Sequence, residues 1–194
     1  MKKIELEIVA LSHSITQTNS YAVVLGEKNG FRRIPIVIGG SEAQAIAVAL
    51  EKINATRPLT HDLMKNLFMA FDVQLHEVII SHVEAGVFFS NLVCSTQNNT
   101  IDIDSRTSDA LALAVRFGCP IYTYDSILKE AGILMEDDGN RKSPKTITSE
   151  SDEHTDLKLL SIEELESLLV EVLEQEDYIT AIAIRDEIKN QKKR

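Results

Sequence analysis

The sequence predicts an α+β fold: a mixed β-sheet with packed helices, followed by a C-terminal α-helical hairpin. The expected order along residues 1–134 is strands, two helices, strands and two helices, which resembles a duplicated unit of hairpin plus helices. A doubly wound fold would instead alternate single strands with single helices. We therefore expect an α+β domain over 1–134, a flexible charged linker over 135–158 and a helical hairpin over 159–194.

The first three strands are predicted from alternation and turn residues. Residues 3–11 alternate apolar with polar side chains, and 20–27 form a second apolar segment. Asn29-Gly30 is a hairpin signal, so 31–38 is the expected return strand. Pro35 cannot donate to a sheet ladder, which predicts an edge position or a bulge there.

Two helices are expected next. Ser41 and Gln44 have the spacing of a capping box before a helix over about 42–53. That helix is apolar nearly all round, which predicts burial against the sheet. Thr60 is the expected cap of the second helix, over about 61–71.

The second half repeats this order. The expected strands are 73–83, 86–94 and 99–104. Thr107 or Ser108 caps a helix through Phe117, and Gly118 ends it as a C′ glycine. A short strand over 120–124 and a short helix, capped by Asp125 and ending at Gly132, complete the domain.

The C-terminal segment changes character. Residues 136–158 are polar and charged without periodicity, as linkers are. Ser161 and Glu164 form a capping box, and two apolar stripes at helical spacing follow within 160–192. Such helices close as an antiparallel hairpin. A unit this small buries little area alone, so it should pack on another copy or on a partner.

Composition limits the function classes. Net charge is −10, and residues 1–134 carry 11 Lys/Arg against 14 Asp/Glu. Because phosphate neutralisation supplies non-specific nucleic-acid affinity, this balance argues against strong duplex binding. No apolar stretch is long enough to span a membrane, and the N-terminal alternation indicates a strand and not a signal peptide, so we expect a cytoplasmic protein. Cys94 and Cys119 have no metal-ligand spacing and are expected to be buried thiols.

Polar clusters precede three of the expected helices. Gly39-Gly40-Ser41-Glu42 offers free backbone N–H groups to an anion, or is only a capped tight turn. Arg57 and the His61-Asp62 pair flank the start of the next helix, where an acidic residue also suits the helix dipole.

The third cluster runs from Asp102 to Asp109. Strand alternation places Asp102 and Asp104 on one face, and Asp109 lies in the first helical turn. Several carboxylates at a strand end suit a divalent cation such as Mg²⁺ or Mn²⁺, or are a solvated strand end. Together the clusters offer acids, an imidazole and guanidiniums, which phosphodiester hydrolysis requires.

At these residues the chain resembles the bifunctional nuclease family over about residues 3–134. The matching segments are 33–39 with Glu42-Ala43, 57–63 and 102–110. Thr107 stands where the family often has Pro, which we expect to alter a turn and not the chemistry. The resemblance implies nuclease activity on DNA and RNA.

With the three clusters, the resemblance predicts a phosphodiesterase for single-stranded or flexible nucleic acid. The candidate acid–base and catalytic residues are His61, Asp62, Glu42 and Asp109. Arg57 and Arg106 are the candidate phosphate ligands. Asp62, Asp104 and Asp109 are the candidate metal ligands.

The hairpin resembles the UVR motif of the repair proteins UvrB and UvrC and of Clp-type ATPases. That resemblance implies protein–protein association through Leu169, Tyr178, Ile182 and Arg185. The combination of both parts also looks like a common bacterial arrangement. Two alternatives to a nuclease stay open: a non-catalytic adaptor, recruited by the hairpin to a repair or protease complex, and a ligand-binding homo-oligomer whose polar helix starts are only caps.

Overall fold

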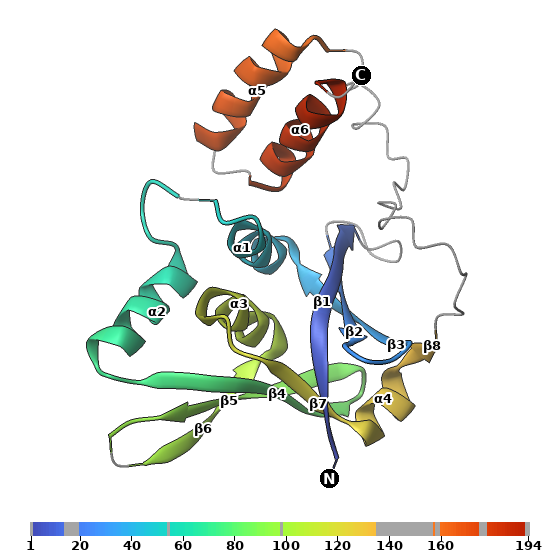
Figure 1. Cartoon of the computed structure of the whole chain (residues 1–194), viewed down its shortest axis with the longest axis vertical. Helices are drawn as coiled ribbons and strands as arrows, with labels where there is room; N and C mark the ends of the chain where they lie inside the picture. Colours follow the sequence, from blue (N-terminus) through green and yellow to red (C-terminus); the bar gives the residue numbers. More distant parts are fainter. Residues whose placement is uncertain are drawn as a thin grey trace.

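Figure 1 shows the protein as a computed structural model. It describes residues 2–13, 20–53, 55–97, 99–134, 157, 160–174 and 178–192. Apart from Leu157, the predicted linker lies outside the described residues.

Eight strands form one mixed sheet, in the order β6-β5-β4-β7-β1-β2-β3-β8. Only the β4–β7 pair is parallel among the described strands. The strands are β1 Lys3–His13, β2 Ser20–Glu27, β3 Arg32–Gly39, β4 Gln74–Glu84, β5 Val87–Ser95, β6 Thr100–Arg106, β7 Ile121–Tyr124 and β8 Ile133–Leu134. The predicted α+β class with a mixed sheet is confirmed.

Helices follow each group of three strands. They are α1 Gly40–Leu50, α2 Thr60–Ala70, α3 Thr107–Phe117 and α4 Asp125–Ala131, and the C-terminal pair is α5 Ile162–Glu174 and α6 Tyr178–Gln191. None of the helices in the described ranges has both the length and the apolar character needed to cross a bilayer.

The two halves of the domain are built alike. An antiparallel meander of β1, β2 and β3 leads into α1, and a meander of β4, β5 and β6 leads into α3. The sheet curves around α1 and α3, which pack against each other (Figure 1). Both helices are buried, and their Ala, Leu and Ile side chains share one core with the strands. The two helices consequently begin close together, each directly after a strand.

Several local predictions are confirmed. Strand β8 pairs with β3 at Arg32 and Arg33 alone. From Ile34 onward β3 is therefore an edge strand, and Pro35 lies on that edge. Gly118 follows α3 with φ of 68°, the left-handed conformation that favours glycine. Cys94 and Cys119 are free thiols, and Cys94 is buried as predicted, whereas Cys119 is only partly buried. Burial still raises the pKa of Cys119 to about 11.

The predicted N-caps are wrong in detail. Helix α1 begins at Gly40 after Gly39, so Ser41 lies inside its first turn and bonds the Glu42 carboxylate. Helix α2 begins at Thr60, and Asp62 accepts the backbone N–H of Leu59 at 3.0 Å. Helix α1 starts two residues earlier than predicted because β3 runs directly into it, and α2, which follows a connection from α1, starts one residue earlier.

Arg116 joins three helices at the centre of the domain. Its Nε donates to Asp62 Oδ1 of α2 at 2.6 Å, and its Nη1 donates to the carbonyl of Ala45 in α1 at 2.9 Å. The side chain is only 5% exposed. Lys65 of α2 also donates to the Arg116 carbonyl. These contacts fix α2 against α1 and α3.

The C-terminal hairpin has its own small core, formed by Leu165 and Val172 of α5 with Ala181, Ile184 and Ile188 of α6. The Ser161–Glu164 capping box is present. Helix α6 contacts α1, and Arg185 Nη2 lies 2.6 Å from Glu51 Oε2 at the end of α1. Figure 1 shows the hairpin on the α1 side of the domain.

Replacing Asp62 should change stability in a pH-dependent way. Burial raises the pKa of Asp62, but the bonds from Arg116 and Leu59 outweigh it and leave the pKa below its usual range. As the pH falls, Asp62 is therefore protonated in the unfolded chain before it is protonated in the folded protein. The stabilisation that its ionised carboxylate provides is lost as a result. Asp62→Asn should cost roughly 1–2 kcal/mol near neutral pH, a value discounted for partial exposure.

The measurement is urea unfolding of both proteins from about pH 6 down to about pH 3, where the difference should shrink. Asp102→Asn, on exposed strand β6, is the control and should be nearly neutral throughout. A difference between Asp62→Asn and the unaltered chain that stays constant with pH would contradict the role given to the ion pair.

Candidate active site

The first turns of α1 and α3 and the start of α2 enclose a cleft of about 640 Å³. Five of the predicted site residues line it: Glu42, His61, Asp104, Arg106 and Asp109. Glu42 is the third residue of α1, and Asp109 is the third residue of α3. The similar construction of the two halves thus places two carboxylates in equivalent positions at one point.

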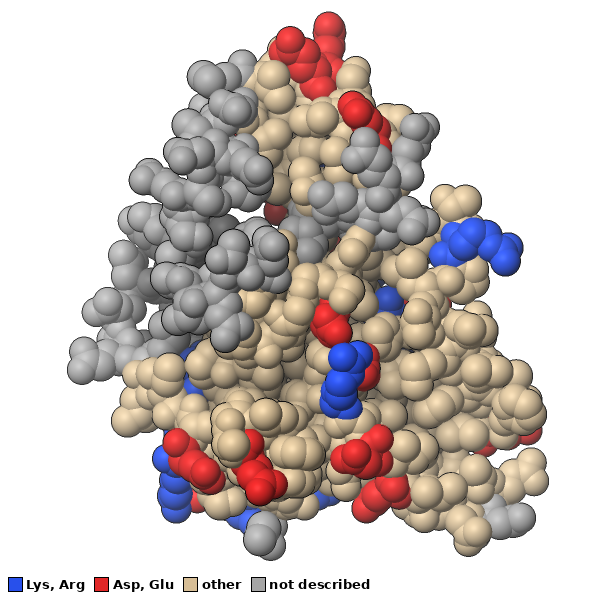
Figure 2. Space-filling view, turned by 180° about the vertical axis from the view of Figure 1, so that it is seen from behind, with Lys and Arg blue, Asp and Glu red and all other residues tan. Residues whose placement is uncertain are grey.

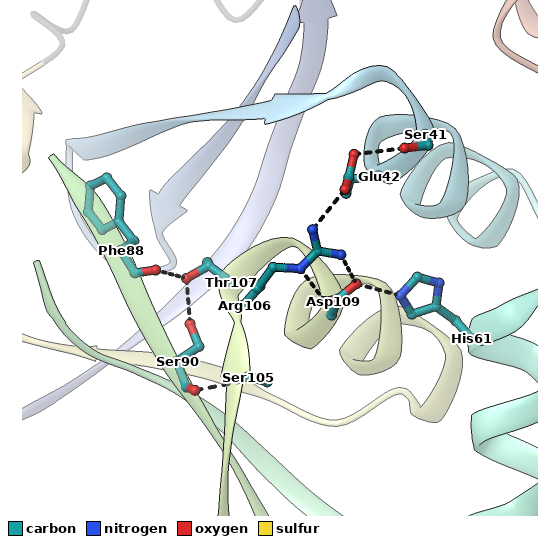
Figure 3. A network of polar contacts seen from close by, with 9 residues as sticks. All are labelled: Ser41, Glu42, His61, Phe88, Ser90, Ser105, Arg106, Thr107 and Asp109. Carbon is teal, nitrogen blue, oxygen red and sulfur yellow. Dashed lines mark hydrogen bonds and ion pairs between the residues drawn. The ribbon is translucent and has the colours of Figure 1, made fainter.

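Arg106 bridges these two carboxylates (Figure 3). Its Nη1 donates to Glu42 Oε1 at 3.0 Å, its Nε to Asp109 Oδ2 at 2.8 Å and its Nη2 to Asp109 Oδ1 at 3.2 Å. The Arg106 side chain is 67% exposed, whereas those of Glu42 and Asp109 are 20% and 27% exposed. The guanidinium therefore stands at the surface of the cleft with the carboxylates beneath it.

His61 reaches the same carboxylate from α2. Its Nε2 lies 3.0 Å from Asp109 Oδ1, and its side chain is 11% exposed. An ionised carboxylate can only accept hydrogen bonds, so Nε2 carries the proton. In the neutral imidazole, Nδ1 is then the nitrogen with a free lone pair. Asp109 thus sets the tautomer of His61, as the aspartate of a catalytic triad does.

Both carboxylates are held in the ionised form. Burial raises the pKa of Asp109, but the hydrogen bonds from Arg106 and His61 outweigh it and leave the pKa below its usual range. The backbone N–H of Glu42 and the Ser41 hydroxyl lower the pKa of Glu42, and Arg106 adds to this. The cleft at neutral pH therefore contains two fixed negative charges under one guanidinium.

Hydroxyl groups fix the start of α3 on strand β5 (Figure 3). Thr107 Oγ1 donates to the Phe88 carbonyl at 2.8 Å, so the Ser90 hydroxyl must donate to Thr107 at 2.7 Å. Thr107 and Ser90 are both buried. Proline at position 107 could make neither bond, and the threonine therefore anchors the helix that carries Arg106 and Asp109.

Two of the other predicted site residues lie outside the cleft lining, and a third belongs to it. Asp62 faces Leu59 and Arg116 and is not part of the cleft lining. Arg57 is exposed on the connection before α2 and does not line the cleft either. Asp104 is exposed on β6 and lines the cleft. The structure therefore gathers four of the six predicted catalytic and phosphate-binding residues.

The predicted metal ligands are not brought together. Asp62, Asp104 and Asp109 form no ligand group, and no set of three or more His, Cys, Asp or Glu side chains suited to a metal occurs among the described residues. The carboxylates of Glu42 and Asp109 are instead occupied by Arg106.

Basic side chains do not gather into a patch on the face in Figure 2. There the Lys and Arg side chains stand singly among uncharged side chains or beside Asp and Glu. This agrees with the acidic balance of the sequence. Of the residues that line the cleft, the one lysine or arginine is Arg106.

The predicted partner-binding residues of the hairpin have mixed surroundings. Leu169 packs against the hairpin's own core, and Ile182 is partly buried. Arg185 pairs with Glu51 and Asp186. The side chain of Tyr178 lies outside the described residues. Among the hairpin side chains that the structure describes, Val170 and Leu173 of α5 are exposed large apolar ones.

Sequence reasoning missed Arg116 and the role of Thr107. The available signal for Arg116 is its spacing: it follows Asp109 by seven residues, so both lie on one face of α3. That face meets α2, where His61 contacts Asp109 and Asp62 contacts Arg116.

The chain is similar to known proteins along this domain. Residues 23–136 match the family model of the bifunctional nuclease domain. Two uncharacterized proteins of Mycobacterium tuberculosis, MT1877 of strain CDC 1551 / Oshkosh and Rv1829 of strain ATCC 25618 / H37Rv, are each 37% identical to it over 129 residues. Each alignment covers 66% of this chain and 77% of the relative. The chain therefore belongs to the bifunctional nuclease domain family.

Proposed function

We propose that the protein hydrolyses phosphodiester bonds of single-stranded DNA or RNA in the cleft between α1, α2 and α3. One observation carries the proposal: His61, Asp109 and Arg106 form a continuous hydrogen-bonded set in a cleft. A base oriented by a carboxylate, beside an exposed guanidinium, meets the two needs of phosphodiester hydrolysis. Membership of the family supports the same reaction class.

Arg106 is the proposed phosphate ligand. It is exposed and presents several N–H donors in a planar fork, the geometry that matches phosphate oxygens. In the free protein these donors are satisfied by Glu42 and Asp109. A phosphate must therefore displace at least one carboxylate contact, and the guanidinium then stabilises the negative charge of the transition state.

His61 is the proposed general base. With Nε2–H donating to Asp109, Nδ1 accepts a proton from the attacking water, and the ionised Asp109 stabilises the resulting imidazolium. The hydroxide adds to phosphorus, the bond from phosphorus to the leaving oxygen breaks, and that oxygen takes a proton from solvent. Glu42 holds the other side of Arg106 and so positions it.

The charge balance sets the expected affinity. Phosphate competes with two ionised carboxylates for one guanidinium, and the domain as a whole is acidic. Counterion release therefore supplies little affinity, and we expect weak binding of short, flexible strands and poor binding of duplexes. Added Mg²⁺ or Mn²⁺, compared with EDTA, shows whether a divalent cation assists by offsetting this charge.

Single substitutions should separate the roles of the three residues. His61→Ala and Asp109→Asn should lower the cleavage rate about a hundredfold or more, because the base or its orientation is lost. Arg106→Met should cause a comparable loss, and Arg106→Lys should restore part of it. The measurement is cleavage of labelled single-stranded DNA and RNA with Mg²⁺, with Mn²⁺ and with EDTA.

His76→Ala is the matched control, because His76 is exposed on β4 and outside the cleft. It should cleave like the unaltered chain. Cleavage by His61→Ala at the rate of the control would show that the activity arises elsewhere or from a contaminant. Absence of cleavage by any protein would favour the adaptor alternative.

We propose a second function for the C-terminal hairpin, docking the nuclease domain on another protein. The supporting observation is that Val170 and Leu173 of α5 stay 58% and 38% exposed, whereas Leu165 and Val172 of the same helix are buried against α6. Exposed apolar side chains close together on one helix are typical of protein-binding surfaces. The resemblance to the UVR motif leads to the same proposal.

The docking proposal predicts loss of partners on changing that surface alone. Full-length Val170→Asp/Leu173→Asp should lose the proteins that the unaltered chain retains in a pull-down, since a charge disfavours an apolar interface. Phe31→Asp, at a 60% exposed position of the β2–β3 turn, is the control and should retain them. Equal recovery of all partners by both variants would refute docking through α5.

A further inference from the structure

A second cleft, of about 470 Å³, lies on the other side of Arg106. It opens between the end of β3 and the tip of the β4–β5 hairpin, and it shares four lining residues with the first cleft: Glu42, Asp104, Ser105 and Arg106. Arg106 is therefore a wall common to both clefts. Figure 3 shows the arrangement, with Phe88 of β5 on one side of Arg106 and His61 of α2 on the other.

The two clefts differ in chemistry. The first contains His61 and Asp109 in addition to the shared residues. In the second, every ionisable residue is a shared one, and the rest of the lining is uncharged. Its apolar part includes Phe88 and two side chains that are more than half exposed, Val37 and Val87. The second cleft therefore suits an uncharged, flat, apolar group attached to whatever Arg106 binds.

We propose that this second cleft holds the nucleobase next to the scissile phosphate. The phosphate lies on Arg106, one flanking nucleoside enters the first cleft beside His61, and the base of the other flanking nucleoside enters the second. This inference rests on the proposed nuclease function and specifies its substrate: an unpaired strand, with a dinucleotide as the smallest unit that fills both clefts.

Three physical points support a base as the occupant. Both volumes fall within the roughly 300–1,000 Å³ of small-molecule sites, so each has room for one nucleoside and neither for a duplex. Aromatic and apolar side chains bind bases by their faces without requiring a given sequence. A base can enter such a cleft only when it is unpaired and unstacked, which excludes intact duplex.

The test measures binding and not cleavage. Full-length His61→Ala protein, which should bind without cutting, is titrated with the dinucleotide dithymidine monophosphate in competition with a labelled single strand. Two further competitors lack one or the other base of the dinucleotide. Loss of one of these two bases should weaken binding about tenfold, because the second cleft then stays empty.

Surface variants locate the base. The variant Val37→Gln/Val87→Gln is combined with His61→Ala. It should weaken binding of the dinucleotide by a similar factor and leave the affinity for the analogue that lacks this base unchanged. The matched control, Ile133→Gln/Leu134→Gln, also replaces two exposed apolar residues, but on β8, and should bind like the parent protein. The proposal is overturned if removal of each base in turn leaves the affinity unchanged. It is also overturned if the valine variant binds the dinucleotide and the analogue equally more weakly, or if the dinucleotide does not bind at all.

The outcome is separable from the nuclease proposal. Cleavage by the unaltered chain together with binding that ignores both bases would keep the nuclease and reject the base cleft. Base-dependent binding without cleavage would keep the base cleft and reject hydrolysis.

Discussion

The packing of α1 against α3 brings two like charges together, and the site depends on how that repulsion is relieved. Each helix starts directly after the last strand of its meander, and each carries a carboxylate at its third position, Glu42 in α1 and Asp109 in α3. Both carboxylates are ionised and both contact one guanidinium, and a cation between two like charges offsets their repulsion. Arg106, the last residue before α3, supplies that cation. The same guanidinium stays exposed, so the group that relieves the repulsion is also the one that a phosphate can reach.

The site is therefore a product of the duplicated architecture, with one addition. The two halves provide the carboxylates and the arginine. Helix α2, which follows α1 without an intervening strand whereas β7 separates α3 from α4, provides His61. Because His61 and Asp62 are neighbours on a helix, they face different ways. His61 turns to Asp109, and Asp62 turns to Arg116, so one side chain belongs to the cleft and the other holds α2 in place. Chemistry and stability are thus assigned to adjacent residues.

Much of the fold could be predicted from local signals, because alternation, Asn29-Gly30, Gly118 and the Ser161–Glu164 box act over a few residues. The clusters around Glu42, His61 and Asp109 could also be identified, since each precedes a helix. Their meeting could not: His61 and Asp109 are 48 residues apart in the chain, and only the packed helices bring them together. The place of Asp62 beside His61 predicts a catalytic role for both residues, although helical geometry points their side chains in different directions. Arg116 was missed because a buried cation resembles an ordinary helix-end arginine in the sequence.

The most direct test of the central claim is a crystal structure of full-length His61→Ala protein with a dinucleotide whose bridging phosphate cannot be cleaved. The account predicts the phosphate on the Arg106 guanidinium, with at least one of the Glu42 and Asp109 contacts displaced and the flanking nucleosides on opposite sides of Arg106. A dinucleotide bound away from Arg106, or a phosphate at Arg57 with the Arg106 network intact, would contradict it.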